Sequence, residues 1–213
     1  MKVEIWTDVI CPWCYIGRRR FEKALTQFSG RATVDVVYRS FELDPNAPAR
    51  SEMNVVERLM TKYGLSAAEA REANQRVTKI AEEEGLEFHL DRARPTNTLA
   101  AHRLLQLASV RRVRPAAEER FQMAYFTEGA PLAEPETLLR LATEAGLKEE
   151  DARHVLAGQA FTLQVRTDEK EAAALGAHGV PLFAFDRRQI VSGAQPTDYL
   201  LQTLESIAST PSC

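Results

Sequence analysis

The 213-residue sequence has few cysteines, no large excess of either charge and no long apolar run. It has 27 Lys plus Arg against 30 Asp plus Glu, so it lacks the basic excess typical of a nucleic-acid-binding protein. No apolar stretch approaches the ~20 residues that a helix needs to cross a bilayer. Ten glycines, ten prolines and three cysteines exclude collagen-like and disulfide-dense chains. We therefore expect a soluble globular protein with neither a membrane nor a nucleic acid as partner.

The N-terminal segment also lacks the features of a secretory signal. Charges at Lys2, Glu4 and Asp8 interrupt it where a signal would carry a continuous apolar stretch. We therefore expect a cytoplasmic protein, in which thiols are kept reduced.

Two of the three cysteines, Cys11 and Cys14, form a C-x-x-C pair, and the third, Cys213, is the last residue. Such a pair in a cytoplasmic chain indicates either zinc binding or redox catalysis. Zinc requires four ligands, and no two histidines are spaced as a ligand pair. The histidines are at positions 89, 102, 154 and 178. The pattern favours a redox pair without a metal. We expect Cys213 to be a free thiol, with a regulatory or intermolecular disulfide as the alternative.

Periodicity predicts a β-α-β unit at the start of the chain. Residues 2–8 alternate as in a strand, residues 13–30 have helical spacing, and residues 33–41 are rich in Val and aromatic side chains. Pro12 suits the first turn of that helix, where no backbone N–H is needed. We expect the two strands to be parallel.

The pattern changes after residue 45, and helix signals dominate residues 46–159. Ser51 is a candidate cap for the first of these helices, and Ser66 with Glu69 forms a capping box for the second. Later helices are predicted to begin at Thr96 or Asn97 and at two prolines. These prolines are Pro115 and Pro135.

Strand character returns after a helix predicted to begin near Gln159. Residues 182–185 and 190–194 form a predicted hairpin, and Pro196 is predicted to open a last helix. Residues 1–45 and 160–213 thus predict one sheet domain that is discontinuous in sequence, and residues 46–159 an inserted all-α domain. The fold class is α/β, with helices on both faces of the sheet.

The order of these features, with the C-x-x-C at the first helix and a proline before the hairpin, resembles a thioredoxin-like fold with a helical insertion. Within that fold, the sequence resembles the DsbA family and its FrnE-like oxidoreductases. The motifs that carry the resemblance keep the family's order along nearly the whole chain. They are residues 8–17 (DVICPWCYIG), 41–45 (FELDP), 97–104 (NTLAAHRL), 124–126 (AYF), 179–183 (GVPLF) and 192–196 (SGAQP).

The predicted chemistry follows from thiol reactivity. The thiolate is the nucleophile, and the partial positive charge of a helix start favours it. Cys11 precedes the helix and is the expected exposed, attacking thiol, whereas Cys14 lies one turn in and resolves the mixed disulfide. Pro12 and Trp13, between the two cysteines, are expected to set the stability of the thiolate. Trp13 either offers an apolar wall to substrate or packs at the edge of the core.

The resemblance implies two further parts of a substrate site. It implies a cis bond at Val180-Pro181, facing the cysteines, so that backbone groups of Val180 pair with an extended substrate. It also implies that Asn97 and His102 approach the redox site from the helical domain, with His102 near Cys11. The alternative is a capping Asn and a packed His. For residues 18–20, three consecutive arginines, we expect a solvated helix face.

Three functions follow from these predictions. The first is a protein disulfide oxidoreductase or isomerase with no cofactor beyond the Cys11–Cys14 pair. Its partners would be thiol or disulfide proteins, glutathione or a small molecule, and a reducing cytoplasm favours reduction or isomerisation. The second is a glutathione-dependent isomerase or transferase of the kappa or 2-hydroxychromene-2-carboxylate type, which uses a single Ser or Cys position. The third is a chaperone that holds clients in an apolar cleft.

Overall fold

The computed structural model describes residues 1–49, 51 and 53–209. The predictions for Cys213 lie outside the described residues. Within the described part, none of the helices combines the length and apolar character that crossing a bilayer requires.

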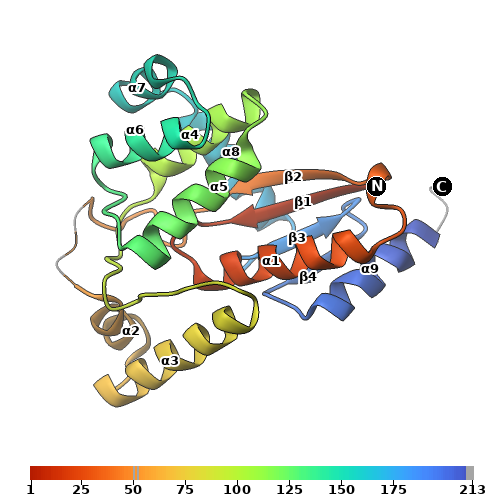
Figure 1. The fold of residues 1–213 in the computed structure, drawn as a ribbon, viewed down its shortest axis with the longest axis horizontal. Coiled ribbons are helices and arrows are strands. Elements are labelled where there is room, and N and C mark those ends of the chain that lie inside the picture. The colour runs from red at the N-terminus through yellow and green to blue at the C-terminus, as the bar shows by residue number, and fades with distance from the viewer. Residues whose placement is uncertain (50, 52, 210–213) are drawn as a thin grey trace.

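A four-stranded sheet runs through the centre of the molecule (Figure 1). Strand β1 (Lys2–Thr7) pairs in parallel with β2 (Asp35–Ser40), and helix α1 (Pro12–Gln27) connects them. β3 (Leu182–Phe185) pairs antiparallel with both β1 and β4 (Gln189–Ser192), which gives the order β2-β1-β3-β4. The predicted β-α-β unit and the predicted hairpin are therefore confirmed, and they join into one sheet.

The two faces of the sheet are covered by different helices because strand side chains alternate in direction. Val3 and Ile5 belong to the core that α1 and α9 (Thr197–Ser209) cover. Trp6 belongs to the opposite face, where it packs with Ala172 of α8 (Thr162–Ala174). The α/β class with helices on both faces is confirmed.

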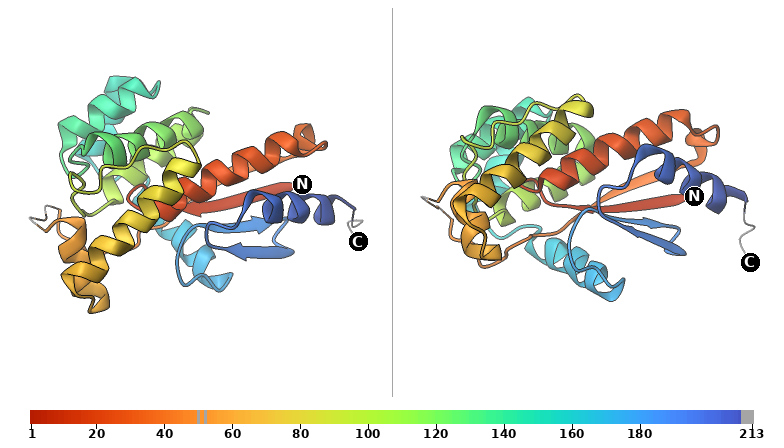
Figure 2. Two further views of the ribbon diagram at one scale, coloured as in Figure 1. Left: turned by 60° about the horizontal axis from the view of Figure 1, so that its bottom comes forward. Right: turned by 90° about the horizontal axis from the view of Figure 1, so that it is seen from below.

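The helical block between β2 and α8 lies beyond one end of the sheet (Figure 2). Its helices are α2 (Val55–Tyr63), α3 (Ala67–Glu83), α4 (Leu99–Val110), α5 (Arg114–Met123), α6 (Pro135–Glu144) and α7 (Glu149–Ala157). A π-helical turn, Ala124–Glu128, follows α5. Tyr15 and Ile16 of α1 belong to the same apolar core as Leu104 and Phe121 of this block. The sequence boundary of the inserted domain stays a prediction, and the packing is continuous across it.

Several predicted helix starts differ from the observed ones. The cap of α2 is Asn54 and not Ser51, since Asn54 and Glu57 form a reciprocal capping box. The predicted box at Ser66 is confirmed for α3. Helix α4 begins at Leu99 rather than at Thr96 or Asn97, and α8 begins later than Gln159. In each case the observed start depends on backbone geometry that residue type alone does not specify.

The expectation of a solvated arginine face at residues 18–20 is wrong for Arg18, whose side chain is 2% exposed. Its guanidinium is paired with Glu119 of α5, and Arg19 also contacts that carboxylate at 3.0 Å. Arg20 bonds Glu84 at 2.6 Å, just after α3. These arginines join α1 to the helical block, because carboxylates from that block approach them.

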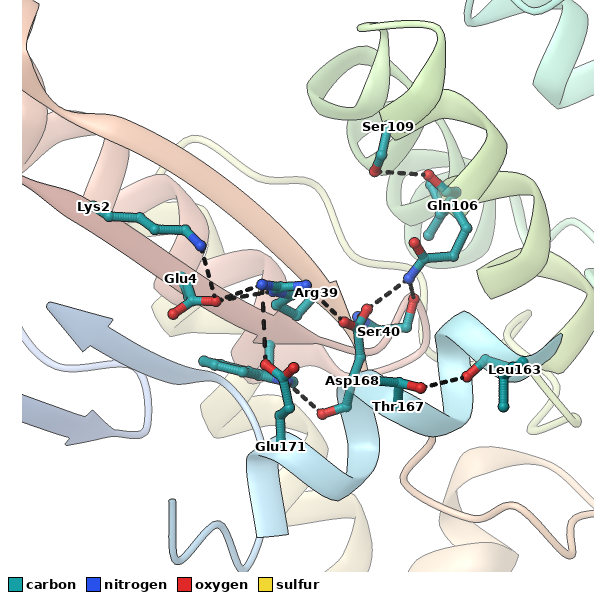
Figure 3. Close-up of polar contacts among 12 residues, drawn as sticks. Lys2, Glu4, Arg39, Ser40, Gln106, Ser109, Leu163, Thr167, Asp168 and Glu171 are labelled. Carbon is teal, nitrogen blue, oxygen red and sulfur yellow. Dashed lines mark hydrogen bonds and ion pairs between the residues drawn. The ribbon is translucent and has the colours of Figure 1, made fainter. Parts of the chain in front are cut away.

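A network of charges covers the α8 face of the sheet (Figure 3). Arg39 of β2 contacts Glu4 of β1 at 2.6 Å and Asp168 of α8 at 3.1 Å. Gln106 of α4 donates to the other oxygen of Asp168 at 2.6 Å. Asp168 thus connects the sheet, α8 and the helical block through paired rather than isolated buried charges.

Because of Glu4, we expect the free energy of unfolding to fall at acid pH. Its side chain is 2% exposed, and hydrogen bonds from Arg187 and Arg39 outweigh burial and lower its pKa from 4.5 to about 2. Because the pKa of Glu4 is lower in the folded protein than in the unfolded chain, the ionised carboxylate stabilises the fold at any pH above the unfolded-state pKa. That stabilisation is lost as the pH falls from about 4.5 toward 2. The loss is at most about 3 kcal/mol, since Arg187 is partly exposed and salt screens the pair. Urea unfolding between pH 6 and 2.5 measures it. In Glu4→Gln the acid loss should shrink by that amount, and an unchanged acid loss would contradict this prediction.

Candidate functional site

The cysteine pair lies where β1 ends and α1 begins. Residues 8–10 make the connection, Cys11 is the N-cap residue of α1, and Pro12 is the first helical residue. Cys14 is one turn into the helix and 0% exposed, whereas Cys11 is 3% exposed. The expectation that Cys11 is exposed is therefore wrong, because its side chain is almost completely buried beside the loop that holds Val180. The order is as expected, with Cys14 the deeper thiol.

The environment of Cys14 favours its protonated form. The backbone N–H of Asp8 donates to Cys14 Sγ at 3.4 Å, and the side chain is completely buried. Burial, reinforced by the neighbouring Cys11, raises the pKa of the Cys14 thiol well above its ordinary value and outweighs the hydrogen bond from the Asp8 N–H, which lowers it. The surroundings of Cys14 therefore favour the thiol over the thiolate.

Cys11 faces the loop before β3. Its Sγ donates to the carbonyl oxygen of Val180 at 3.5 Å, and the Val180–Pro181 bond is cis. Gly17 of α1 allows the close approach of this loop, since a Cβ at that position would lie 2.9 Å from Pro181 Cγ. The structure thus brings the cysteine pair, Val180 and Pro181 together.

A cleft of about 1010 Å³ opens beside Cys11, and we call it the cysteine cleft. Pro12, Trp13 and Val180 line it together with Cys11. Trp13 is 42% exposed, which favours the apolar-wall interpretation over packing at the core edge. The opposite wall comes mostly from the helical block, with apolar side chains from α2, α3 and the π-helical turn. These are Val55, Leu59, Tyr63, Val77, Ile80, Tyr125 and Phe126.

Charges in the cleft are unevenly distributed. Arg58 and Lys62 lie one turn apart on α2, and Arg58 pairs with Asp44 at 2.7 Å. Glu42 and Glu169 line the facing wall, and both are paired with Arg166, at 2.5 and 2.8 Å. On the α2 wall, two cations are thus accompanied by the one carboxylate of Asp44, whereas on the facing wall two carboxylates share the one guanidinium of Arg166.

Asn97 and His102, predicted to bind substrate, are not among the residues that line the cleft. Asn97 donates to the carbonyl of Pro45 at 3.2 Å and accepts from the N–H of Leu99 at 3.0 Å. The N-cap residue of α4 is Thr98, so Asn97 forms a turn just before the helix and the capping alternative is not confirmed. His102 is completely buried, and its Nε2 lies 3.3 Å from Asp8 Oδ1. The helical block thus reaches the loop before Cys11 through His102, which contacts Asp8.

Sequence reasoning gave no role to Asp8, Glu42, Arg58 or Lys62. Asp8 and Glu42 lie within the sequence motifs 8–17 and 41–45, so these motifs could have pointed to them as site residues. The spacing of Arg58 and Lys62 by four residues places them on one helix face, but nothing in the sequence says what that face meets. Among the described residues, no group of three or more His, Cys, Asp or Glu side chains is arranged to hold a metal ion.

Comparisons with known proteins agree on the fold. The family model for the DSBA-like thioredoxin domain matches residues 2–205. A probable DsbA oxidoreductase from Streptomyces coelicolor is 41% identical, with a TM-score of 0.96, and the match covers 100% of this chain and 92% of that one. A search of curated proteins found no match.

Two more distant structures are alike in fold only. The cytosolic disulfide reductase DsbM from Pseudomonas aeruginosa, solved with GSH, is 21% identical with a TM-score of 0.68, covering 99% of this chain and 100% of that one. A 2-hydroxychromene-2-carboxylate isomerase is 16% identical with a TM-score of 0.68, and the match covers 98% of this chain and 95% of that one.

Proposed function

The chain belongs to the DSBA-like thioredoxin domain family, a family of thiol–disulfide oxidoreductases, and from this premise we propose that it exchanges disulfides through Cys11 and Cys14. Cys11 attacks a substrate disulfide and forms a mixed disulfide. Cys14 then attacks Cys11 Sγ, forms the internal disulfide and releases the second substrate thiol. Reversing both steps oxidises a substrate dithiol.

One observation carries this proposal: the two thiols occupy different environments at one helix start. Cys11 lines the cysteine cleft, so a substrate sulfur can reach it, whereas Cys14 is sealed behind it. This asymmetry supports separate attacking and resolving roles. The carbonyl of Val180 beside Cys11 Sγ supports substrate positioning by that loop.

The substrate we propose is a thiol or disulfide with an apolar neighbourhood, from a protein client, glutathione or another small molecule. The apolar cleft walls favour such groups, and the cationic side chains Arg58 and Lys62 favour carboxylates near the sulfur. We place the activity in the cytoplasm and in the direction of reduction or isomerisation. The DsbM structure, described as a cytosolic disulfide reductase with GSH, is compatible with this placement.

A glutathione-dependent isomerase or transferase remains a second candidate. The similar fold of the 2-hydroxychromene-2-carboxylate isomerase and the size of the cleft favour it. The presence of both Cys11 and Cys14 argues against it, since that chemistry uses one Ser or Cys position. The apolar cleft also supports the third function, a chaperone that holds clients, and this role is compatible with either enzymatic activity.

Equilibration in graded glutathione buffers, read by mass spectrometry after acid quench, tests the proposal. We expect one transition, from two free thiols at positions 11 and 14 to a single disulfide between them. A midpoint near ~−270 mV would favour a reductase, and one near ~−120 to −180 mV an oxidase or isomerase. Failure to form the internal disulfide across the whole range would refute the dithiol mechanism. A persistent glutathione adduct on Cys11 would favour the second candidate.

A further inference from the structure

Helix α2 differs from the other helices in how little of it is buried. None of its nine residues, Val55–Tyr63, is buried, whereas every other described α-helix buries at least two residues. Its main packing partner is α3. In Figure 1, these two helices form a pair set apart from α4–α7. A helix with few buried contacts separates from its neighbours at a low cost in free energy, so α2 is the helix of this block best suited to move.

The two sides of α2 border two hollows. Val55 and Leu59 line the cysteine cleft. Val56 and Met60 line a second groove of about 940 Å³, which we call the outer groove. Asn74 of α3 borders both hollows, so they lie next to each other. The helix can therefore shift toward the outer groove without displacing a closely packed core.

One ion pair joins α2 to the facing side of the cleft. Arg58 donates to Asp44 Oδ2 at 2.7 Å, and the two side chains are 21% and 33% exposed. The hydrogen bond from Arg58 outweighs burial and holds the pKa of Asp44 below its ordinary value, so the carboxylate is ionised at neutral pH. Among the described residues, no other ion pair or side-chain hydrogen bond joins α2 to a segment outside it.

Asp44 lies on the fixed side of the cleft. Its neighbours Leu43 and Pro45 line the cleft, and both are held by hydrogen bonds. The N–H of Leu43 donates to Asp8 at 2.8 Å, and the carbonyl of Pro45 accepts from Asn97 at 3.2 Å. These bonds attach the segment around Asp44 to the loop that follows β1 and to the segment before α4. The ion pair therefore joins a movable helix to a fixed wall.

The position of Cys11 limits what can reach its sulfur. The side chain is 3% exposed, and it lines the cysteine cleft of about 1010 Å³. That volume is at the upper end of the range found for small-molecule sites. A small disulfide fits into such a cleft. A disulfide on a folded protein is carried by a convex body, which the α2 wall keeps away from Cys11.

We propose that α2 is a lid over Cys11, held closed by the Arg58–Asp44 pair, and that the closed lid restricts disulfide exchange to small disulfides. This inference rests on the proposed function and narrows its substrate class. A small disulfide enters while the lid is closed. A disulfide of a folded protein reacts only after the ion pair has broken and α2 has moved toward the outer groove. Arg58 and Asp44 thus determine specificity without touching the reacting sulfurs.

A comparison of two disulfides of different size tests the lid. The reduced full-length protein is mixed with hydroxyethyl disulfide or with insulin, a folded protein disulfide, quenched with acid at set times and analysed by mass spectrometry. Each rate is divided by the rate of dithiothreitol with the same disulfide, which removes differences in intrinsic reactivity. This relative rate should be at least about 10-fold lower for insulin, because an open state of higher free energy is a minor population.

Asp44→Asn tests the ion pair, because it removes the charge and keeps the shape of the side chain. The relative rate for insulin should rise about two- to fivefold, the change that loss of a partly exposed ion pair makes to an open–closed equilibrium. The rate with hydroxyethyl disulfide should stay within about twofold of the parent's rate, since this reagent does not need an open lid. A variant with a merely destabilised fold would lose rate with both disulfides.

Glu72→Gln is the matched control. It breaks the ion pair of Glu72 with Arg76 at 2.7 Å, which lies within α3 and does not join α2 to the facing wall. Both relative rates should therefore equal those of the parent. Equal relative rates for the two disulfides in the parent, or an insulin rate that Asp44→Asn leaves unchanged, would overturn the lid and keep the proposed function. If the parent reacts with neither disulfide, the proposed function fails, and the narrower substrate class fails with it.

Hydrogen exchange of backbone amides is a second measurement, and it needs neither a substrate nor a variant. In the parent, the amides of α2 should exchange faster than those of α1, because the lid opens without unfolding of the sheet. Protection of α2 as strong as that of α1 would contradict a movable lid. In Asp44→Asn, α2 exchange should speed up by the same two- to fivefold, about the loss of one ion pair, while α1 is unchanged.

Discussion

Replacing Cys11 with serine should lower the rate of disulfide exchange by at least about 10³-fold, because a hydroxyl cannot replace the thiolate as nucleophile. The cleft remains, so the variant should still bind a disulfide substrate. Cys14→Ser should act differently. Its attack step persists, since Cys11 lines the cleft, and the product should remain as a mixed disulfide.

Both variants are best compared in a Cys213→Ser background, which removes the third thiol of the chain. Turnover with hydroxyethyl disulfide and intact-mass analysis of the protein are the two measurements. The expected pattern is no adduct for Cys11→Ser and one stable adduct for Cys14→Ser. An adduct on Cys14 in the Cys11→Ser protein would reverse the assigned roles of the two cysteines.

Arg114→Met should destabilise the fold by about 3–5 kcal/mol, because it leaves a buried carboxylate without its cation. Nε of Arg114 donates to Glu118 at 3.0 Å, and Glu118 is 0% exposed. The other oxygen of Glu118 accepts from the hydroxyl of Thr7 at 2.6 Å, at the end of β1. The loss should appear as a melting temperature lower by about 6–20 °C for a chain of this size.

The double variant Arg114→Met with Glu118→Gln is the control. It removes both charges and keeps a group that can accept from Thr7, so most of the lost stability should return. Denaturant unfolding of the parent, the single and the double variant measures this coupling. A double variant as unstable as the single one would mean that the lost packing of Arg114, and not the unpaired carboxylate, causes the effect.

Prediction from sequence worked where the signal is local. The strand alternation in residues 2–8, the capping box at Ser66 and the proline after Cys11 depend on neighbours within a few positions. The C-P-W-C motif is four consecutive residues, so predicting the helix from its periodicity also placed the motif at the start of that helix. The start of α2 was missed because Ser51 and Asn54 are both good caps, and only the reciprocal bond with Glu57 selects Asn54.

The surroundings of the cysteines could not be predicted in the same way. Cys11 was expected to be exposed, but its side chain is 3% exposed, with its sulfur beside the carbonyl of Val180 in the loop before β3. Arg18 was expected in solvent, and it is buried because Glu119, 101 residues away, neutralises it. Helical spacing says that a side chain lies on a given face but not which other segment packs there.

By itself, the sequence determined the C-x-x-C pair, its position at the start of a helix and the α/β class, since hydrogen bonding and periodicity act within one segment. Only the tertiary structure decided that Cys11 opens into an apolar cleft with charged side chains on both walls. It also decided that His102 meets Asp8 beside Cys14. The physical reason is that these environments are made by segments far apart in the chain, and the packing of a shared core sets their distances.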